Sequence, residues 1–225
     1  MHRSGNAEGG PSVKETTGNA DTQGKAPQHV AQMLGDWWTR PDAERLSLWG
    51  STAYREQVAT LWRENLGDAS GESVERLLSA LAVEQHQLAA EYERLFVGPA
   101  AISCPPYEAV WRTDRPKQEQ GTVVGKSTEQ VKQLYSELGL RLQPDQVELA
   151  DHIAIELEAL AYAWDSGADS SLADRLLRQF QGWLPPFCAS VVVNCRLEFY
   201  RQLAEITKEC FLGNQSIVGW CLRRN

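Results

Sequence analysis

The sequence predicts an all-α fold, a single globular domain in which many helices surround one core. Apolar residues recur at helical spacing over most of the chain. Runs of β-branched residues are short, at 122–124 and 191–193, and the second run lies within a helical pattern. With 225 residues and 42% apolar content, the chain can bury a substantial core. We therefore expect one helical domain, from residue 29 to residue 225.

The first 28 residues differ in composition from the rest of the chain. They are rich in Gly, Ser, Thr, Asn and Lys, and they contain almost no large apolar side chains. Such a segment cannot bury enough apolar surface to offset the entropy that ordering would cost. We predict that residues 1–28 form a disordered N-terminal tail and that helical spacing begins near residue 29.

In the first part of the domain, the apolar pattern predicts helices that lead to a loop. Pro41 and Asp42 are typical of a helix start, and Gly50 interrupts the helix that follows. A turn over residues 67–71 precedes a longer stretch, over residues 74–96, whose apolar side chains share one face. We expect this longer stretch to be one continuous amphipathic helix that ends at the loop.

After the loop, the pattern predicts two more helices. Ser127 and Gln130 resemble a capping box that opens a short helix, and Gly139 is placed to close it. Pro144 stands where a helix can begin with proline, and Gly167 ends the apolar pattern that follows it. The pair Asp151-His152 is therefore expected to lie within this second helix.

The last part of the domain is expected to contain a short helix and then a long one. The short helix covers residues 172–180. Residues 183–187 read Trp-Leu-Pro-Pro-Phe, and two prolines in succession predict a turn there. A long helix over residues 191–211 then completes the domain.

Charge and composition exclude several classes of function. The net charge of −8 argues against a nucleic-acid binder, which needs clustered Lys and Arg, and it favours encounters with a cationic partner. The sequence has no uncharged apolar run of about 18 residues and no apolar signal core at its start. We therefore expect neither a membrane span nor a secretion signal.

The cysteines predict neither disulfides nor a metal site. Their number is odd, they include no Cys-x-x-Cys pair, and the chain is large enough to fold without covalent links. We interpret them as reduced thiols of a cytoplasmic protein, mostly packed in helices, and we expect no zinc. They are Cys104, Cys188, Cys195, Cys210 and Cys221.

Residues 121–128 end like a phosphate-binding loop, with Gly125-Lys126-Ser127. That motif requires a glycine five positions before Gly125, where this chain has Gln120, and no strand precedes the segment. We interpret it as a surface turn and helix cap.

Two further features are open to a structural or a functional interpretation. Asp151 and His152 can cap a helix or bond a neighbouring loop, or they can grip a cationic ligand. Adjacent helical residues project about 100° apart and no nucleophile is placed beside them, so catalysis is not indicated. Tyr107 and Trp111 lie in a proline-rich loop, which either caps the core or forms one wall of an apolar groove.

Several short motifs, taken in order, resemble the TorD/DmsD family of redox-enzyme maturation chaperones, in particular its DmsD-like branch. The resemblance extends over roughly residues 41–212 and rests on the order and spacing of the motifs. They are Tyr92-x-x-Leu95-Phe96, Gly98-Pro99, Pro105-Pro106-Tyr107-Glu108, Val110-Trp111, Asp151-His152, Glu156-Leu157, Trp183-Leu184-Pro185 with Phe187, Phe199-Tyr200 and Leu203-Ala204.

The resemblance implies a cytoplasmic all-helical chaperone without catalytic activity, cofactor or metal. Such proteins bind the apo form of a molybdenum-cofactor oxidoreductase, often through its twin-arginine signal peptide, assist cofactor insertion and delay export until maturation. By motif, the residues implied in signal-peptide binding are Tyr92, Leu95, Phe96, Pro106, Tyr107, Asp151 and His152.

A twin-arginine leader joins two arginines to an apolar stretch, so its receptor needs an apolar groove with acid at one end. Leu95, Phe96, Tyr107 and Trp111 are candidates for the groove, and Asp151 is the candidate acid. Leu95 and Phe96 are, by helical spacing alone, more typical of a core. Three more carboxylates are candidates for an acidic rim: Glu91, Glu108 and Glu156.

Other interpretations remain open. The protein can be a helical adaptor that acts on the mature part of its client and ignores the leader. A hydrolase or nucleotide-dependent protein that uses Asp151, His152 or Lys126 is a further alternative. The chain is compatible with a monomer and with a domain-swapped dimer, since proline and glycine hinges join its long helices.

Overall fold

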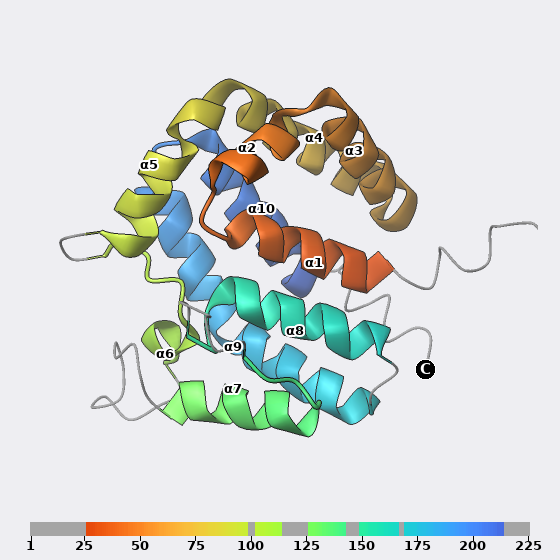
Figure 1. Cartoon of the computed structure of the whole chain (residues 1–225), viewed down its shortest axis with the longest axis vertical. Coiled ribbons are helices and arrows are strands. Elements are labelled where there is room, and N and C mark those ends of the chain that lie inside the picture. The colour runs from red at the N-terminus through yellow and green to blue at the C-terminus, as the bar shows by residue number, and fades with distance from the viewer. Residues whose placement is uncertain (1–25, 99–101, 114–125, 143–148, 167–168, 214–225) are drawn as a thin grey trace, which may run out of the picture.

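The computed structural model describes residues 26–98, 102–113, 126–142, 149–166 and 169–213, and over these ranges it is helical and contains no β-strand (Figure 1). The predicted all-α fold is thus confirmed. The elements are α1 (Ala26–Trp38), α2 (Ala43–Gly50), α3 (Thr52–Leu66), α4 (Asp68–Glu84), the 3-10 helix η1 (Gln85–Gln87), α5 (Leu88–Tyr92), the π-helix η2 (Glu93–Val97), α6 (Glu108–Trp111), α7 (Lys126–Glu137), α8 (Ile153–Asp165), α9 (Ser170–Asn194) and α10 (Glu198–Leu212).

Helices that are distant in the sequence lie side by side in the fold. In Figure 1, α1 runs along α8, and it also contacts α10, which packs against α4 and α9. Helices α3 and α4 pair at one end of the molecule, and α7 lies beside α9 at the other. The N-terminal helix is therefore packed into the domain by α8 and α10, which come from the last third of the chain.

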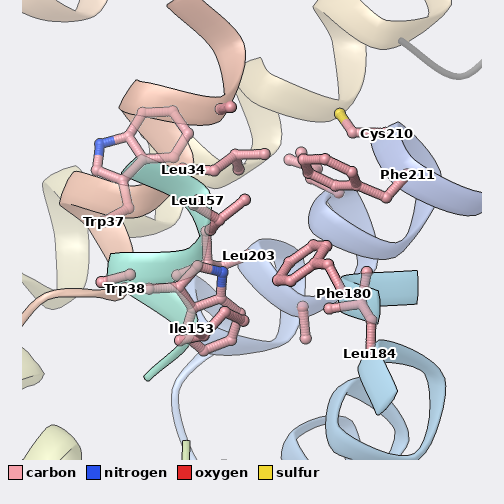
Figure 2. Close-up of a cluster of buried hydrophobic side chains, with 14 of the residues drawn as sticks. Leu34, Trp37, Trp38, Ile153, Leu157, Phe180, Leu184, Leu203, Cys210 and Phe211 are labelled. Carbon is pink, nitrogen blue, oxygen red and sulfur yellow. The ribbon is translucent and has the colours of Figure 1, made fainter. Parts of the chain in front are cut away.

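The core gathers large aromatic and aliphatic side chains from these helices. Figure 2 shows Leu34 and Trp38 of α1 facing Leu157 of α8, with Phe180 of α9 and Phe211 of α10 opposite. All five side chains are buried. Burial of residues of this size stabilises the fold by roughly 1.5–3 kcal/mol for each side chain.

Two buried tryptophan side chains have a hydrogen-bond acceptor for the N–H group of the indole. The Nε1 of Trp38 donates to the hydroxyl of Thr207, over 3.0 Å, and the Nε1 of Trp49 donates to a carboxylate oxygen of Asp36, over 2.8 Å. A buried N–H without an acceptor costs about 1–3 kcal/mol, so these bonds allow tryptophan to fill the core. They also link α1 to α10 and to α2.

Local capping residues determine where α2 and α3 begin. The side chain of Asp42 accepts the N–H of Arg45 and so caps α2, as its position after Pro41 predicted. Ser51 follows Gly50, ends α2 and caps α3 by accepting the N–H of Tyr54. The predicted interruption at Gly50 is therefore confirmed. The first helix starts at Ala26, which is three residues earlier than the pattern indicated.

The expected continuous helix over residues 74–96 is wrong. The chain there forms α4, η1, α5 and η2 in succession. In η2 the N–H of Gly98 reaches the carbonyl of Glu93, five residues back, over 2.6 Å. The carbonyl of Leu95 then accepts the N–H of Cys104, over 3.0 Å. The widened turn therefore fastens the loop that follows to the end of the helix.

The expected turn at residues 183–187 is also wrong, because α9 runs for 25 residues with Pro185 and Pro186 inside it. Proline removes a backbone donor and usually breaks a helix. Here Trp183, Leu184 and Phe187, which flank the prolines, are fully buried. Their packing against the core holds the helix together across the prolines.

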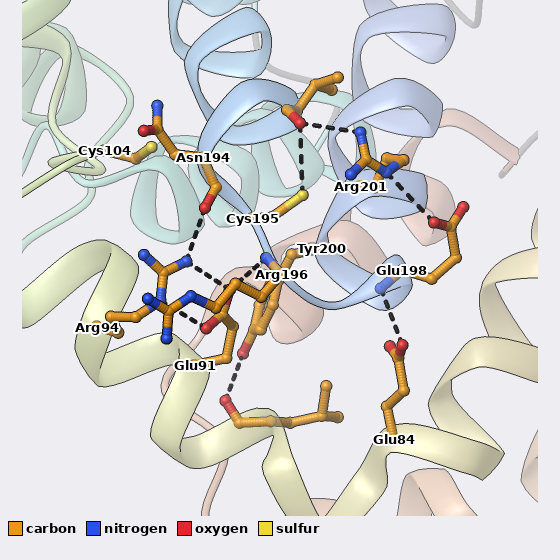
Figure 3. Close-up of polar contacts among 12 residues, drawn as sticks. Glu84, Glu91, Arg94, Cys104, Asn194, Cys195, Arg196, Glu198, Tyr200 and Arg201 are labelled. Atoms are coloured by element: carbon orange, nitrogen blue, oxygen red, sulfur yellow. Dashed lines mark hydrogen bonds and ion pairs between the residues drawn. The ribbon is translucent and has the colours of Figure 1, made fainter.

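The long helix expected over residues 191–211 is divided, because α9 ends at Asn194 and α10 begins at Glu198. The cap of α10 comes from a distant residue. The carboxylate of Glu84 accepts the N–H groups of Glu198, over 3.0 Å, and of Phe199, over 2.9 Å (Figure 3). No residue next to the break could have indicated it.

Two predictions about α7 have different outcomes. Gly139 follows the helix with a φ of +76°, and the N–H of Leu140 bonds the carbonyl of Tyr135, so the predicted glycine stop is confirmed. The start differs, because α7 begins at Lys126 and includes Ser127. Residues 121–125 and Pro144 lie outside the described residues.

Candidate functional site

The loop after η2 pairs with the start of α8 through backbone hydrogen bonds. The N–H of Ile153 donates to the carbonyl of Pro106 and the N–H of Glu108 donates to the carbonyl of Asp151, each over 2.9 Å. A carboxylate oxygen of Asp151 also accepts the N–H of Ala109, over 3.1 Å. We call this pairing of residues 106–109 with residues 151–153 the clasp.

Asp151 and His152 precede α8, so their predicted location inside a helix is wrong. His152 is the N-cap of α8, and its Nδ1 accepts the N–H of Ala154, over 3.2 Å. An accepting Nδ1 leaves Nε2 as the protonated nitrogen of the neutral ring. The imidazole also meets the ring of Tyr107 edge to face, with centroids 5.3 Å apart. Asp151 and His152 thus have the two structural roles considered above, a bond to the loop and a helix cap.

Three carboxyl groups are buried in or near the clasp: those of Glu108, Asp151 and Glu156. Glu108 accepts from Nε2 of Gln179, over 2.9 Å, and pairs with Arg112, over 3.4 Å. Burial raises the pKa of Asp151, although the bond from the Ala109 N–H opposes the rise. Burial, and then the charges of Glu108 and Asp151, raise the pKa of Glu156 well above its usual value.

The three acids expected on an exposed rim, Glu91, Glu108 and Glu156, are all buried. Their location therefore differs from the prediction, because each of them receives hydrogen bonds within the fold. A fully buried carboxylate can reach a peptide only if the surrounding structure opens. A direct part for these acids in ligand binding stays a prediction.

Glu91 fixes the η2 region to the turn between α9 and α10 (Figure 3). Its carboxylate accepts two bonds from the Arg94 guanidinium, over 2.6 and 2.7 Å, and one from the Arg196 N–H, over 2.6 Å. Arg94 also donates to the carbonyl of Asn194, over 2.7 Å. Burial tends to raise the pKa of Glu91, but the bonds from Arg94 and Arg196 outweigh it and leave the pKa below its usual value.

Tyr92, Leu95 and Phe96 belong to the core. Their side chains are at most 2% exposed. The Phe96 ring lies 5.0 Å from the ring of Tyr92, 5.5 Å from that of Tyr200 and 5.8 Å from that of Trp38, measured between centroids. These three predicted binding residues are therefore packed in the core and do not face solvent.

The predicted site residues that are partly exposed come from the loop and from α6. Trp111 is the last residue of α6, so its expected position in the loop is wrong. Tyr107 and Trp111 are half-buried, whereas Pro106 is buried. Trp111 donates from Nε1 to the carbonyl of Pro105, over 2.6 Å, and its ring lies 5.9 Å from the ring of Phe187. The loop thus covers the core with one side of its aromatic residues and leaves the other side exposed.

Two adjoining pockets follow the exposed side of α8, and no prediction from the sequence included them. One has a volume of 360 Å³ and lies against α1, with Gln28 and Asp165 in its wall. The other has a volume of 220 Å³ and lies against the segment after α7, with Leu140 in its wall. Glu158 and Tyr162 line both pockets. One feature of the sequence could have indicated these pockets. Glu158 and Tyr162 are four positions apart in an otherwise apolar segment, so they lie on one side of the helix.

A third pocket has the opposite charge. It has a volume of 450 Å³, lies between α7 and α9, and is lined by Arg112, Arg175 and Arg178 together with glutamines. Arg175 pairs with Glu137, over 2.6 Å. Acidic and apolar side chains therefore line the two pockets along α8, with Arg141 in one of them, whereas arginines line the pocket between α7 and α9.

The described residues offer no metal-binding cluster. Within them, no group of three or more His, Cys, Asp or Glu side chains could hold a metal ion. The described cysteines, Cys104, Cys188, Cys195 and Cys210, are unpaired and buried, and burial raises the pKa of each thiol. Among the helices in these ranges, none has the length and apolarity to cross a membrane.

Comparisons with known proteins give consistent results. The family model described as nitrate reductase delta subunit matches residues 63–189. The chaperone protein TorD of Shewanella pealeana is 28% identical over 54% of this chain, and the Tat proofreading chaperone DmsD of Salmonella typhi is 27% identical over 55%. These two matches span only 56% and 58% of the relatives' own lengths. TorD of Shewanella loihica is 26% identical over 88% of this chain and 93% of its own.

A solved structure has the same fold. It is the crystal structure of a protein from Archaeoglobus fulgidus that is assigned provisionally as a redox enzyme maturation protein. The two structures superpose with a TM-score of 0.54 at 20% sequence identity, over 88% of this chain and 99% of the other. At this identity the similarity concerns the fold alone.

Proposed function

Because the chain belongs to the TorD/DmsD family of redox-enzyme maturation chaperones, we propose that it binds the precursor of a molybdenum-cofactor oxidoreductase. In this proposal it recognises the twin-arginine signal peptide, the apo form of the enzyme, or both. It assists cofactor insertion in the cytoplasm and delays export until the client is mature. It carries out no chemical reaction of its own.

The observation that carries the proposal is the clasp. The residues that family resemblance assigns to leader binding come from separate segments, and the bond between Ala109 and Asp151 joins positions 42 residues apart. The clasp sets Tyr107 against His152, and Trp111 packs on Phe187 beside it. A rigid aromatic loop on a fixed helix start is suited to recognition, because little entropy is lost when a ligand binds.

The location of these residues gives them different parts in the proposed function. Tyr107 and Trp111 are partly exposed and can contact a peptide. Phe96, Asp151 and His152 are buried. Asp151 and His152 act as positioning residues, since they bond the loop and cap α8, whereas Phe96 stabilises the core. Loss of a positioning residue is expected to weaken binding through disorder of the loop, and to lower stability as well.

Titration of the purified protein with synthetic twin-arginine leader peptides tests the proposal. The peptides come from molybdoenzyme precursors of the same organism, and the matched control has both arginines replaced by alanine. We expect saturable binding of at least one leader and weaker binding of its control. Absence of binding to every leader and to every full-length precursor contradicts the proposal.

A second arm separates leader recognition from recognition of the mature client. Binding is measured for a full-length precursor and for the same precursor without its leader. Equal affinities contradict leader recognition and favour an adaptor that acts on the mature part. A lower affinity without the leader supports the proposed function.

A further inference from the structure

We propose that the pocket between α7 and α9 binds an acidic segment of a partner protein, whose carboxylates pair with Arg112, Arg175 and Arg178. We call it the basic pocket. Three arginines, three glutamines and one leucine line it. The inference does not depend on the proposed function, because it concerns another surface and a ligand whose charge is opposite to that of a twin-arginine leader.

The charge of the basic pocket contrasts with that of the whole chain. The net charge is −8, so composition does not explain why three arginines line one pocket of 450 Å³. In Figure 1, α6, α7 and α9 come together at one end of the molecule. Arg112 directly follows α6, whereas Arg175 and Arg178 are three positions apart on α9 and so share one face of it. A local positive field of this kind attracts acidic ligands to an otherwise acidic protein.

The two arginines of α9 are accessible to a carboxylate from outside. Arg178 is exposed, and within the described residues no acidic side chain pairs with it. Arg175 pairs with Glu137, over 2.6 Å, but both side chains are partly exposed, and such a surface pair contributes little free energy. A carboxylate of a partner can therefore pair with Arg178 and can replace Glu137 at Arg175. Guanidinium groups bind carboxylates through two parallel hydrogen bonds, which gives such pairs their specificity.

A glycine of α9 makes room for the third arginine. The guanidinium of Arg112 donates to the carbonyl of Gln179, over 3.2 Å, and pairs with Glu108, over 3.4 Å. A Cβ atom at Gly182 would lie only 2.9 Å from Nη1 of Arg112, so any larger residue there would displace the guanidinium. Glycine is unfavourable in the interior of a helix. The close approach of Arg112 gives a physical reason for glycine at this position of α9.

The other lining residues favour a peptide over a simple anion. Nε2 of Gln133 donates to Glu137, over 3.1 Å, and Nε2 of Gln179 donates to Glu108, over 2.9 Å. The amide oxygens of these glutamines can accept the N–H groups of a peptide backbone, whereas phosphate or sulfate needs donors. Leu134 is the one apolar side chain of the lining, so the pocket is poorly suited to a flat ring. Clusters of arginine recur in proteins that recognise acidic motifs.

The experiment titrates the full-length protein with a fluorescent peptide in which glutamate alternates with serine. The control peptide has glutamine in place of every glutamate and should bind weakly. The variants are Arg178→Glu, the milder Arg178→Gln, and the control Arg76→Glu, which reverses an exposed arginine of α4 at the opposite end of the molecule. We expect roughly tenfold weaker binding of the acidic peptide for Arg178→Glu, a smaller loss for Arg178→Gln and little change for Arg76→Glu. Circular dichroism establishes that each variant is folded.

A variant that changes no charge tests the part of Arg112. Gly182→Ala places a methyl group where the guanidinium lies, and the flexible side chain of Arg112 has to move away. Alanine favours a helix more than glycine does, so the stability should not fall. Binding of the acidic peptide should nevertheless weaken by roughly threefold. Unchanged affinity would overturn the part assigned to Arg112.

Three outcomes overturn the proposal as a whole. The first is that the acidic peptide does not bind, or binds the wild type and Arg178→Glu equally well. The second is that inorganic phosphate or pyrophosphate binds and the peptide does not, which would make the pocket an oxyanion site. The third is a wild-type dimer, detected by sedimentation, that Arg178→Glu dissociates, because the occupant would then be a second copy of this chain. Titration with a twin-arginine leader is a separate measurement, so the proposed function stands or fails independently.

Discussion

At the scale of single residues, the buried carboxyl of Glu156 is the least ordinary group in the fold. One of its oxygens accepts from Nε1 of Trp183, over 3.4 Å, and the other has no partner within the described residues. Its neighbours Glu108 and Asp151 are also acids. Ionisation of Glu156 therefore opposes folding, because a buried charge close to other negative charges lacks compensation.

This leads to a prediction for pH-dependent stability. The pKa of Glu156 is higher in the folded state than in the unfolded chain, so its contribution to stability falls as the pH rises above about 4.5. Glu156→Gln removes the titration and can still accept from Trp183. We expect the variant to exceed the wild type in unfolding free energy, by more at pH 8 than at pH 5. Urea denaturation at both pH values measures this.

The matched control is Glu56→Gln, which changes an exposed glutamate of α3. It should alter the stability little at either pH. A gain for Glu156→Gln that is larger at pH 5 than at pH 8 would contradict the assigned direction of the pKa shift.

A second residue-scale prediction separates the core from the exposed loop. Phe96→Ala removes a buried ring that contacts four other rings, so it should lower the unfolding free energy by about 3–5 kcal/mol. Tyr107→Ala affects a half-buried ring and should cost less stability, while it weakens leader binding by about 2 kcal/mol. Denaturation and peptide titration are compared for both variants. Val193→Ala, at an 81% exposed position, is the neutral control.

The result is informative in both directions. If Tyr107→Ala destabilises the fold as much as Phe96→Ala and leaves leader affinity unchanged, the loop is only a cap on the core. That was one of the two interpretations that the sequence left open.

At the scale of elements, the ends of the helices depend on partners that are distant in the sequence. The N-terminus of α10 is capped by Glu84, which stands 114 positions before Glu198. Local patterns therefore predicted one helix where the fold has two. A local cap such as Asp42 was predictable because the donor and the acceptor are three residues apart.

The distant cap gives a prediction. Glu84→Ala leaves the first N–H groups of α10 without an acceptor, so it should lower the unfolding free energy by about 1–2 kcal/mol. The amides of Glu198 and Phe199 should then exchange hydrogen faster, while those at the middle of α10 change little. Hydrogen exchange read by NMR measures each amide. Unchanged protection at both positions would show that another group caps the helix.

The start of α8 gives a second prediction at this scale. His152→Ala removes the acceptor for the Ala154 N–H, which should lower the unfolding free energy by about 1 kcal/mol from the lost cap and by more from lost packing. His152→Asn restores a side chain that can cap, so it should recover part of the loss. Urea denaturation compares the two variants. Equal stability of His152→Asn and His152→Ala would mean that the cap contributes nothing.

At the scale of the whole molecule, the excess of negative charge should steer a cationic leader towards the protein. The net charge is −8, so the rate of association with a twin-arginine peptide should fall as salt rises. Stopped-flow measurements between roughly 50 and 500 mM salt determine this rate. The control leader without arginines should show a much smaller change. A rate that does not depend on salt would contradict a part for charge in recognition.

The helical class and the family could be predicted from the sequence, because periodicity and motif order are local properties. The resemblance assigned Tyr107 and His152 to one binding site, but their contact could not be predicted, since no local pattern brings those positions together. The burial of Glu91, Glu108 and Glu156 was missed, because partners such as Gln179 come from other helices. The two pockets along α8 were missed because they form only after α1 and Leu140 are placed on either side of α8.

The packing of α1 on α8 also bears on how the chain is made. The bond between Gln28 and Asp165 joins positions 137 residues apart. At roughly 5–20 residues per second, the ribosome needs roughly 7 to 27 seconds to synthesise that interval. During this time the apolar face of α1 lacks α8, the helix against which it packs most extensively. The nascent chain is therefore itself a candidate client of the general chaperones that act during translation.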